Sequence, residues 1–211
     1  MNQWAPDIVS TKYWHKLENG RFDKLKASRF QCDLCPRECI LQNGQRGLCF
    51  VRMALDDQIV LTTYGRSSGF CIDPIEKKPM FHLLPGSRSY SIATVGCNFR
   101  CRFCQNADIA QMPRDRDGLV MGDQCTPQEV VADALRHKCQ SIAYTYTEPT
   151  IFFEFALDTA KLAHGQRLKN VFVTNGYMTP EALEMAAPFL DGANVDLKAF
   201  SDDFYKHQCG A

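Results

Sequence analysis

Three cysteines spaced C-x3-C-x2-C constrain this chain more than any other feature of its sequence. Cys97, Cys101 and Cys104 lie in the segment GCNFRCRFCQN, directly after a short apolar stretch, residues 91–95, that predicts a β-strand. The loop after a strand is where α/β folds place their active sites. A structural zinc site wants four ligands, whereas three thiolates can hold three irons of a [4Fe–4S] cluster and leave the fourth iron open. We therefore expect an open iron–sulfur site, because zinc would need a distant fourth ligand.

The total cysteine content supports metal ligation over disulfides. There are 11 cysteines, an odd number, and the first 20 residues contain no basic region followed by an apolar run. The absence of that pattern predicts no secretory signal and a reducing, cytoplasmic location. No stretch of about 18 uncharged apolar residues predicts a membrane span. The 24 basic and 24 acidic residues balance, which argues against nucleic acid as the partner.

From residue 91 onward, short apolar segments alternate with helical patterns. Further strands are predicted at residues 141–146 (SIAYTY), 171–174 (VFVT) and 193–197 (ANVDL). Helices are predicted after Thr126, over residues 151–163 and after Thr179, the first opened by a Thr-Pro-Gln-Glu capping box. The residues expected to face inward are Val130, Val131, Ala134, Leu135, Phe152, Phe155, Ala156, Ala163, Leu183, Ala186, Ala187 and Leu190. This alternation indicates an α/β fold with a parallel sheet and right-handed crossovers.

The first 90 residues differ from the rest, and we expect two parts: a cysteine-rich region over residues 1–90 and a core over 91–211. Four cysteines spaced C-x2-C-x3-C-x9-C, namely Cys32, Cys35, Cys39 and Cys49, are enough for a closed site. Zinc and an iron–sulfur cluster both fit four thiolates, and reduced thiols without metal are the alternative. The region is turn-rich, so we expect a metal rather than a core of its own to hold it together. Cys71, Cys125, Cys139 and Cys209 have no partner at ligand spacing and are expected to be core or surface thiols.

The C-x3-C-x2-C spacing on a strand-to-helix loop resembles the radical SAM superfamily. The resemblance implies that the open iron binds S-adenosylmethionine (SAM), which accepts an electron and yields a 5′-deoxyadenosyl radical that abstracts hydrogen from a substrate. Phe103 matches the aromatic residue that the family places near the adenine. A core position is the alternative for that side chain.

Three later strand ends carry further matching motifs. Thr147, Glu148 and Pro149 resemble the family's Gly-Glu-Pro segment, whose glutamate binds the methionyl ammonium. Here threonine replaces the glycine, so that the backbone is expected to approach SAM less closely. Glu148 has the alternative of complementing the dipole of the next helix.

The remaining two motifs resemble glycyl-radical-enzyme activases. Asn175 would lie by the ribose, although Asn-Gly is also an ordinary turn pair. By the same resemblance Lys198 would pair with the SAM carboxylate and Asp196 would lie by a monovalent cation. Val173 replaces an aspartate of the activases, which weakens the case for that cation site.

A narrower resemblance covers the chain from about Cys32 to Lys198. The segment DPIEKKPMFH, residues 73–82, and YTYTEP, residues 144–149, are similar to the AmmeMemoRadiSam-system radical SAM proteins, relatives of pyruvate formate-lyase activating enzyme. That resemblance implies an oxidoreductase of the activating-enzyme type, an electron donor such as flavodoxin or ferredoxin, and a protein as a candidate substrate. Lys77, Lys78 and His82 are either substrate contacts or solvated charges, and we assign them no role.

Chain length is the last constraint. Radical SAM enzymes of this kind use a partial (β/α) barrel of six strand–helix units, whereas the residues from Cys97 onward leave room for about four. We therefore expect a partial barrel truncated after about four units, with the fourth strand at an open edge. The alternatives are an inactive fragment and a non-catalytic zinc or iron–sulfur module. A thiol–disulfide oxidoreductase is disfavoured because no βαβ pattern follows Cys32 and Cys35.

Overall fold

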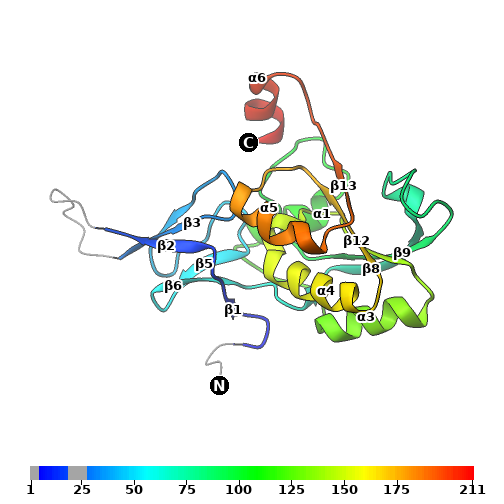
Figure 1. Cartoon of the computed structure of the whole chain (residues 1–211). Coiled ribbons are helices and arrows are strands. Elements are labelled where there is room, and N and C mark those ends of the chain that lie inside the picture. Colours follow the sequence, from blue (N-terminus) through cyan, green and yellow to red (C-terminus); the bar gives the residue numbers. More distant parts are fainter. Residues whose placement is uncertain (1–4, 19–27) are drawn as a thin grey trace.

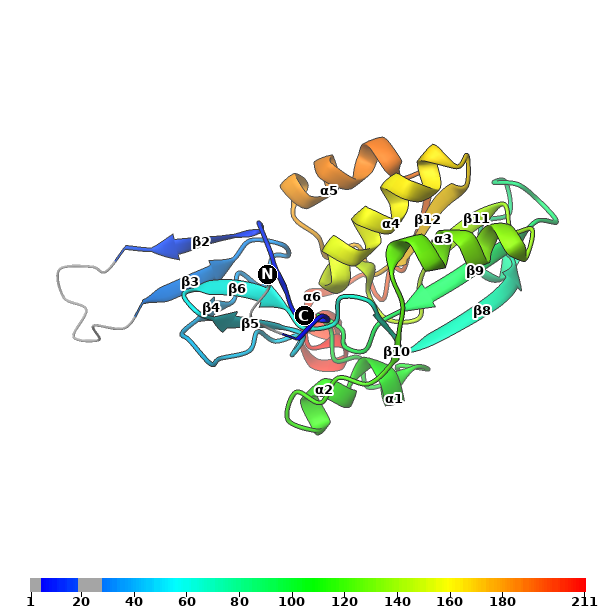
Figure 2. The same cartoon turned by 90° about the horizontal axis from the view of Figure 1, so that it is seen from below.

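The computed structural model describes residues 5–18 and 28–211. Residues 1–4 and 19–27, which belong to the predicted N-terminal region, lie outside the described residues. The described chain forms a group of short strands beside a larger sheet that is covered by helices (Figures 1 and 2). Among the described residues, no helix combines the length and the apolar character that a bilayer crossing requires.

The main sheet has five strands. They are β8 (Gly69–Pro74), β9 (Arg88–Ala93), β11 (Ser141–Tyr144), β12 (Lys169–Thr174) and β13 (Gly192–Val195), in the order β13-β12-β11-β9-β8. The four strands from β9 to β13 are parallel, and β8 pairs antiparallel with β9. The parallel sheet confirms the predicted α/β class, and the four parallel strands lie where the sequence placed them within a few residues. The six-unit barrel and its truncation stay predictions.

Helices cover one face of this sheet. Figure 2 shows α3 (Pro127–Arg136), α4 (Phe153–Gly165) and α5 (Pro180–Ala186) together on that side. Short 3-10 helices, η2 (Pro149–Phe152) and η3 (Ala187–Phe189), precede α4 and follow α5. The capping box is confirmed, because the Thr126 hydroxyl accepts from the Glu129 N–H at 3.2 Å and the Glu129 carboxylate accepts from the Thr126 N–H at 2.7 Å.

Most, but not all, of the helix residues that were predicted to face inward are buried. Leu135 and Leu183 are 42% and 52% exposed. In α5 the buried pair is Ala182 and Ala186, which are four residues apart and therefore share one face. Leu183 lies about 100° around the helix from Ala182, on the side that faces solvent. Ala187 is exposed as well and Leu190 is half-buried.

The N-terminal region contains short strands, of which the sequence predicts one, at residues 60–64, that overlaps β6 (Gln58–Leu61). One sheet has the order β1-β6-β5 and another the order β2-β3-β4. Their bounds are β1 Val9–Ser10, β2 Trp14–Leu17, β3 Arg29–Cys32, β4 Ile40–Leu41, β5 Arg52–Leu55 and β6 Gln58–Leu61. β7 (Arg66–Ser67) pairs with β10 (Asp123–Gln124) in the second half of the chain.

This region packs into the core of the main sheet. Phe30, Val51, Ile59 and Leu61 are fully buried in the same hydrophobic cluster as Phe153 of α4. Apolar packing therefore contributes to holding the region in place, and the metal expected on its cysteines stays a prediction. The predicted boundary at residue 90 also falls inside that sheet, since β8 precedes it and β9 spans it.

The C-terminal segment returns to the cysteine loop. Ser201 caps α6 (Asp202–Phe204), accepting from the Phe204 N–H at 3.4 Å, and a π-helical turn, η4 (Tyr205–Cys209), follows. The Arg100 and Arg102 N–H groups donate to the carbonyls of Cys209 and Gln208 at 2.7 and 2.9 Å. This segment therefore packs on the loop that carries the three predicted cluster ligands.

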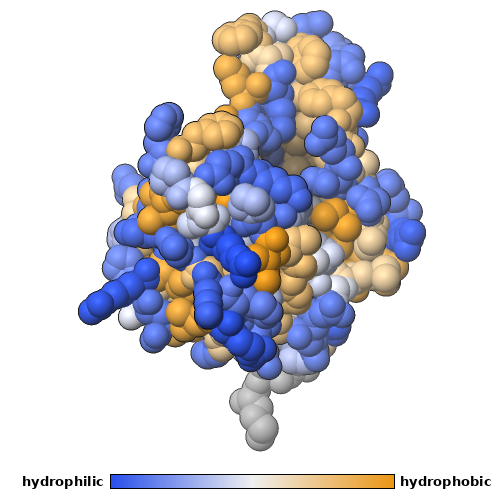
Figure 3. Space-filling view, turned by 90° about the vertical axis from the view of Figure 1, so that its right-hand side faces the viewer, coloured by the Kyte–Doolittle hydropathy of each residue, from blue (hydrophilic) through white to orange (hydrophobic). Residues whose placement is uncertain are grey.

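Exposed apolar side chains precede that segment. Val195 at the end of the edge strand β13 is exposed, as are Leu197 and Phe200 after it. Among the described strands, the single neighbour of β13 is β12. Figure 3 shows hydrophobic residues on the protruding C-terminal part and a hollow between it and the rest of the molecule.

Candidate active site

A cavity of about 350 Å³ lies where the four parallel strands end. The segments that follow these strands contribute its walls, and two short helices, α1 (Ala107–Ala110) and α2 (Met112–Asp115), follow the cysteine loop. All nine residues predicted for the cluster and for SAM line this one cavity: Cys97, Cys101, Phe103, Cys104, Thr147, Glu148, Asn175, Asp196 and Lys198. Because the carboxyl ends of parallel strands meet at one sheet edge, motifs far apart in sequence come together there.

The cysteine loop presents its three thiols to the cavity from a tight backbone. The Phe99 N–H donates to the Cys97 sulfur at 3.4 Å, and the Cys104 N–H donates to the Cys101 carbonyl at 3.2 Å. Burial raises the pKa of the Cys97 and Cys101 thiols to about 12, and nearby Glu148 and Cys209 respectively contribute to the rise. A metal bound here must therefore displace protons from the thiols.

Cys209 lies next to this loop. Its thiol is fully buried, and its proximity adds to the rise in the pKa of Cys101. The sequence predicted a core or surface thiol, and the structure makes it a core thiol beside a predicted cluster ligand. Among the described residues, no three Cys, His, Asp or Glu side chains converge closely enough for a single metal ion.

Glu148 connects the ends of two strands. Its carboxylate is fully buried, and Oε1 accepts from the Thr150 hydroxyl, the Thr174 hydroxyl and the Thr150 N–H at 2.6, 2.7 and 3.0 Å. Among the described residues, Oε2 accepts from the Asn175 N–H alone, at 2.8 Å, which leaves one lone pair for a further donor. Burial raises the pKa of this carboxyl and the donors only partly offset that rise. Glu148 thus caps η2, which agrees with the alternative that it complements the dipole of the next helix. It also faces the cavity.

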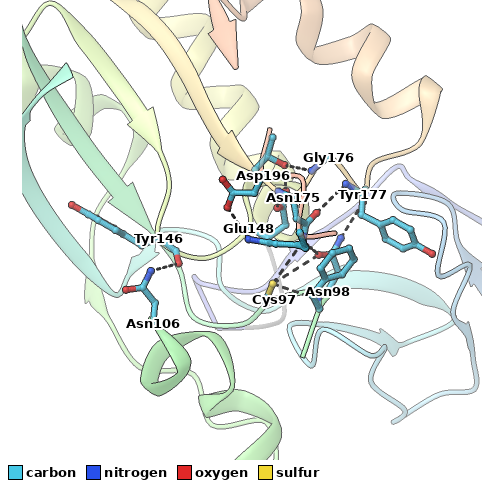
Figure 4. Close-up of polar contacts among 12 residues, drawn as sticks. Cys97, Asn98, Asn106, Tyr146, Glu148, Asn175, Gly176, Tyr177 and Asp196 are labelled. Carbon is cyan, nitrogen blue, oxygen red and sulfur yellow. Dashed lines mark hydrogen bonds and ion pairs between the residues drawn. The ribbon is translucent and has the colours of Figure 1, made fainter. Parts of the chain in front are cut away.

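Asn175 links the cysteine loop to the end of β12 (Figure 4). Its side-chain amide donates to Asn98 Oδ1 at 2.8 Å, and its side-chain carbonyl accepts from the Tyr177 N–H at 2.9 Å. The Asn98 amide in turn donates to the Tyr177 carbonyl at 3.0 Å. The sequence did not single out Asn98, although it lies between two predicted cluster ligands.

Lys198 and Asp196 form an ion pair at the rim of the cavity. The ammonium lies 2.8 Å from Asp196 Oδ2 and the Lys198 N–H donates to the Tyr205 hydroxyl at 3.0 Å. Burial lowers the pKa of Lys198, but Asp196 and the nearby Cys101 and Cys97 outweigh it, so that the pKa is raised. The lysine therefore presents a stable positive charge beside the thiols.

Phe103 and Thr147 occupy different settings. Phe103 is 50% exposed, with its ring 5.7 Å from that of Phe204, so the core alternative for this side chain is wrong. The Thr147 hydroxyl donates to the Thr94 carbonyl at 2.8 Å. Its polar group is therefore used to fix the loop, and its backbone lines the cavity.

A model of the radical SAM superfamily matches residues 91–210, more than half of the chain. The chain belongs to the radical SAM superfamily. Membership implies SAM-dependent radical chemistry, with SAM and a [4Fe–4S] cluster as cofactors. The matched region contains every residue of the cavity described above.

Two relatives come from Methanocaldococcus jannaschii. The first, uncharacterized protein MJ0808, is 43% identical over 190 residues, which cover 90% of this chain and 55% of the relative. The second, uncharacterized protein MJ0674, is 28% identical over 127 residues, which cover 58% of this chain and 35% of the relative. The chain thus spans about half the length, or less, of the curated relatives that it matches.

The residues of this radical SAM chain fit the cofactors that the family uses. Three thiols supply soft ligands for iron, and the cavity also offers a carboxylate with a free lone pair, an ammonium and an exposed aromatic ring. These groups match the ammonium, carboxylate and adenine of SAM in charge and polarity. A cavity of about 350 Å³ also lies in the range of small-molecule sites.

A second part of the cavity wall was missed by the sequence analysis. Tyr146 has a left-handed φ of 66°, and its carbonyl accepts from the Asn106 amide at 2.8 Å (Figure 4). Its hydroxyl points the other way and donates to Asp73 at 2.8 Å, where buried Lys78 also lies 2.7 Å away. The Asp-Pro-Ile-Glu-Lys-Lys segment was visible in the sequence, but its packing against Tyr146 was not. The solvated interpretation of Lys78 is wrong, because its side chain is 2% exposed.

The four N-terminal cysteines share a second cavity. Cys32, Cys35, Cys39 and Cys49 all line it, together with Arg52 and Asn98. Asn98 touches Asn175 of the first cavity through a hydrogen bond, so the two cavities are neighbours. The structure thus brings together the four cysteines that the sequence analysis grouped.

Proposed function

We propose that this chain binds SAM and a [4Fe–4S] cluster in the first cavity and abstracts hydrogen from a substrate. The observation that carries the proposal is the convergence of three thiols with Glu148, Asn175 and Lys198 on one cavity. When bound, the cofactors supply one electron to the SAM sulfonium, which breaks a carbon–sulfur bond and gives methionine and a 5′-deoxyadenosyl radical.

The chain's own groups would position SAM. Glu148 Oε2 has one unused lone pair and would accept from the methionyl ammonium. Lys198, which Asp196 holds in its charged form, would pair with the SAM carboxylate. Asn175 would contact the ribose, and the ring of Phe103 would cover the adenine because it is exposed at the cavity. Asp196 forms an ion pair with Lys198, so this contact gives no support for the monovalent-cation site that the resemblance to activases implies beside Asp196.

The finer assignment is an oxidoreductase of the activating-enzyme type in the AmmeMemoRadiSam-system group. Its support is the segment from Asp73 to His82, whose Asp73 and Lys78 contact cavity-lining Tyr146. We propose a protein as substrate, flavodoxin or ferredoxin as electron donor, and a cytoplasmic location without nucleic-acid or membrane partners. We also propose a second metal, zinc or iron–sulfur, on the four N-terminal cysteines, which share a cavity.

Anaerobic reconstitution tests this function against a non-catalytic metal module. We expect an electron paramagnetic resonance signal from a reduced [4Fe–4S] cluster that changes when SAM is added, and 5′-deoxyadenosine formation with dithionite. The C97A/C101A/C104A variant should lose both. A reconstituted cluster whose spectrum does not change when SAM is added would contradict the proposal and favour the non-catalytic module.

A further inference from the structure

The four thiols of the N-terminal group line one cavity. A backbone N–H points at one of them, because Cys39 accepts from the Leu48 N–H at 3.5 Å. The cluster loop has a similar contact, in which the Phe99 N–H donates to Cys97 at 3.4 Å. Such donors stabilise sulfur in its negatively charged, metal-binding form.

A buried positive charge lies beside these thiols. Arg52 lines the same cavity with a side chain that is 3% exposed. Burial raises the pKa of the Cys32 and Cys49 thiols, and the charge of Arg52 offsets part of that rise. Arg52 also pairs with Glu154 of α4, which keeps the guanidinium fixed. The cavity therefore combines four sulfurs with a fixed cation that can balance part of the negative charge of thiolate ligands.

The ligand spacing favours iron–sulfur over zinc. Structural zinc sites commonly use two separate pairs of ligands, each pair closely spaced. Here three cysteines fall within eight residues, C-x2-C-x3-C, and a single cysteine follows ten residues later. Runs of three closely spaced cysteines are typical of iron–sulfur proteins, and the first cavity uses the same two intervals in the opposite order.

The two cysteine groups share a wall. Gly96, next to Cys97, has φ 102°, and a Cβ there would lie 3.0 Å from the Cys49 carbonyl oxygen and 2.8 Å from Val51 Cγ1. Arg37, two residues after Cys35, donates to the Asn98 carbonyl at 2.9 Å. One backbone segment, residues 96–98, thus separates the two groups of thiols. Electron transfer between sites that close is fast because its rate falls steeply with distance.

We propose that Cys32, Cys35, Cys39 and Cys49 hold a [4Fe–4S] cluster that passes electrons to the cluster on Cys97, Cys101 and Cys104. The relay rests on the proposed function, which supplies the electron acceptor. In the step, a reduced one-electron donor protein such as flavodoxin is oxidised and the N-terminal cluster is reduced. That cluster is then reoxidised as the core cluster is reduced. One electron moves each time, and no bond or proton changes place.

Metal content and spectra test the site itself. The full chain is reconstituted anaerobically with iron and sulfide as wild type, C97A/C101A/C104A and C35A/C39A, with C71A/C125A as a control that removes thiols outside both cavities. We expect about eight irons per chain in wild type and control and about four in each of the other two variants. The reduced wild type should also show magnetic coupling between two neighbouring clusters. Zinc or no metal in C97A/C101A/C104A would overturn the site.

The relay has its own test. In C35A/C39A the core cluster should still be reduced by dithionite, a small reductant, while its reduction by flavodoxin should be lost. Equal flavodoxin rates in C35A/C39A and wild type would overturn the relay and leave the site standing. If C35A/C39A does not fold, magnetic coupling between two clusters in the reduced wild type still tests whether the N-terminal cluster is present.

The outcomes separate this proposal from the proposed function. If C97A/C101A/C104A retains about four irons but the wild-type spectrum ignores SAM, the N-terminal cluster stands and the SAM function fails. If the wild type responds to SAM but C97A/C101A/C104A contains no iron, the SAM function stands and the N-terminal cluster fails.

Discussion

The buried ammonium of Lys78 lies 2.7 Å from Oδ2 of Asp73, at the end of β8. Tyr146, whose hydroxyl donates to the same oxygen, lines the first cavity. The pair therefore supports one wall of the cavity from outside it. Exposed Lys77 contacts the other oxygen of Asp73 at 2.8 Å.

Replacing Lys78 with Met should destabilise the protein by about 3 kcal/mol, because removal of one partner leaves a buried charge poorly compensated. Lys77→Met is the matched control, and it should cost much less than Lys78→Met, since that lysine is 65% exposed and solvent screens its ion pair. Urea unfolding followed by circular dichroism measures both. Equal losses of unfolding free energy in the two variants would show that the burial of Lys78 contributes nothing to stability.

Acid should weaken the same cluster. Burial raises the pKa of Asp73, but hydrogen bonds from Lys77, Lys78 and Tyr146 outweigh it and hold that pKa well below its usual range. The stabilisation is therefore present above about pH 4 and is lost as the pH falls further through the folded-state pKa. Asp73→Asn should unfold more easily at pH 7 and show a flatter loss of stability below about pH 4.

The strand ends and their motifs were predictable because each motif is contiguous and parallel strands gather their ends at one edge. The nine cavity residues were named from the resemblance of these motifs to radical SAM proteins, and the strand-end rule explains why they meet in one cavity. The other strands of the N-terminal region, apart from the one predicted at residues 60–64, were not predictable, since most are two to four residues long and show no sustained alternation. The proximity of Cys209 to Cys101 and the contact of Lys78 with Asp73 depend on tertiary packing that local patterns do not encode.

Glu148→Gln should weaken SAM binding by at least about tenfold, since a hydrogen bond to a charged group contributes about 1.5–3 kcal/mol. The new amide would also oppose the Asn175 N–H, which now donates to Oε2. Thr150→Val is the control, because it removes a donor to Oε1 only and should lower stability without changing the charge that faces the cavity. Isothermal titration of reconstituted protein with SAM gives the affinities. Unchanged affinity in Glu148→Gln would remove this residue from the SAM site.

Phe103→Ala should weaken SAM binding about fivefold, as loss of an aromatic contact costs about 1 kcal/mol. Its ring is half-exposed and contributes little to the hydrophobic core, so the melting temperature of the variant should stay within error of wild type. Phe81→Ala is the matched control: that ring is 61% exposed and does not line the first cavity. If both variants bind SAM equally well, Phe103 does not contact the adenine.

Arg52 and Glu154 should be the strongest single connection between the N-terminal strands and α4. Their side chains are 3% and 13% exposed, and the Arg52 Nε also donates to the Ile151 carbonyl at 3.2 Å. Arg52→Met should cost about 3–5 kcal/mol, because it leaves the Glu154 carboxylate unpaired in a poorly solvated place. Adding Glu154→Leu should recover part of that loss, because the unpaired charge is then removed as well. Urea unfolding of both single variants and the double variant closes the cycle, and strictly additive losses would show that the two side chains are not coupled.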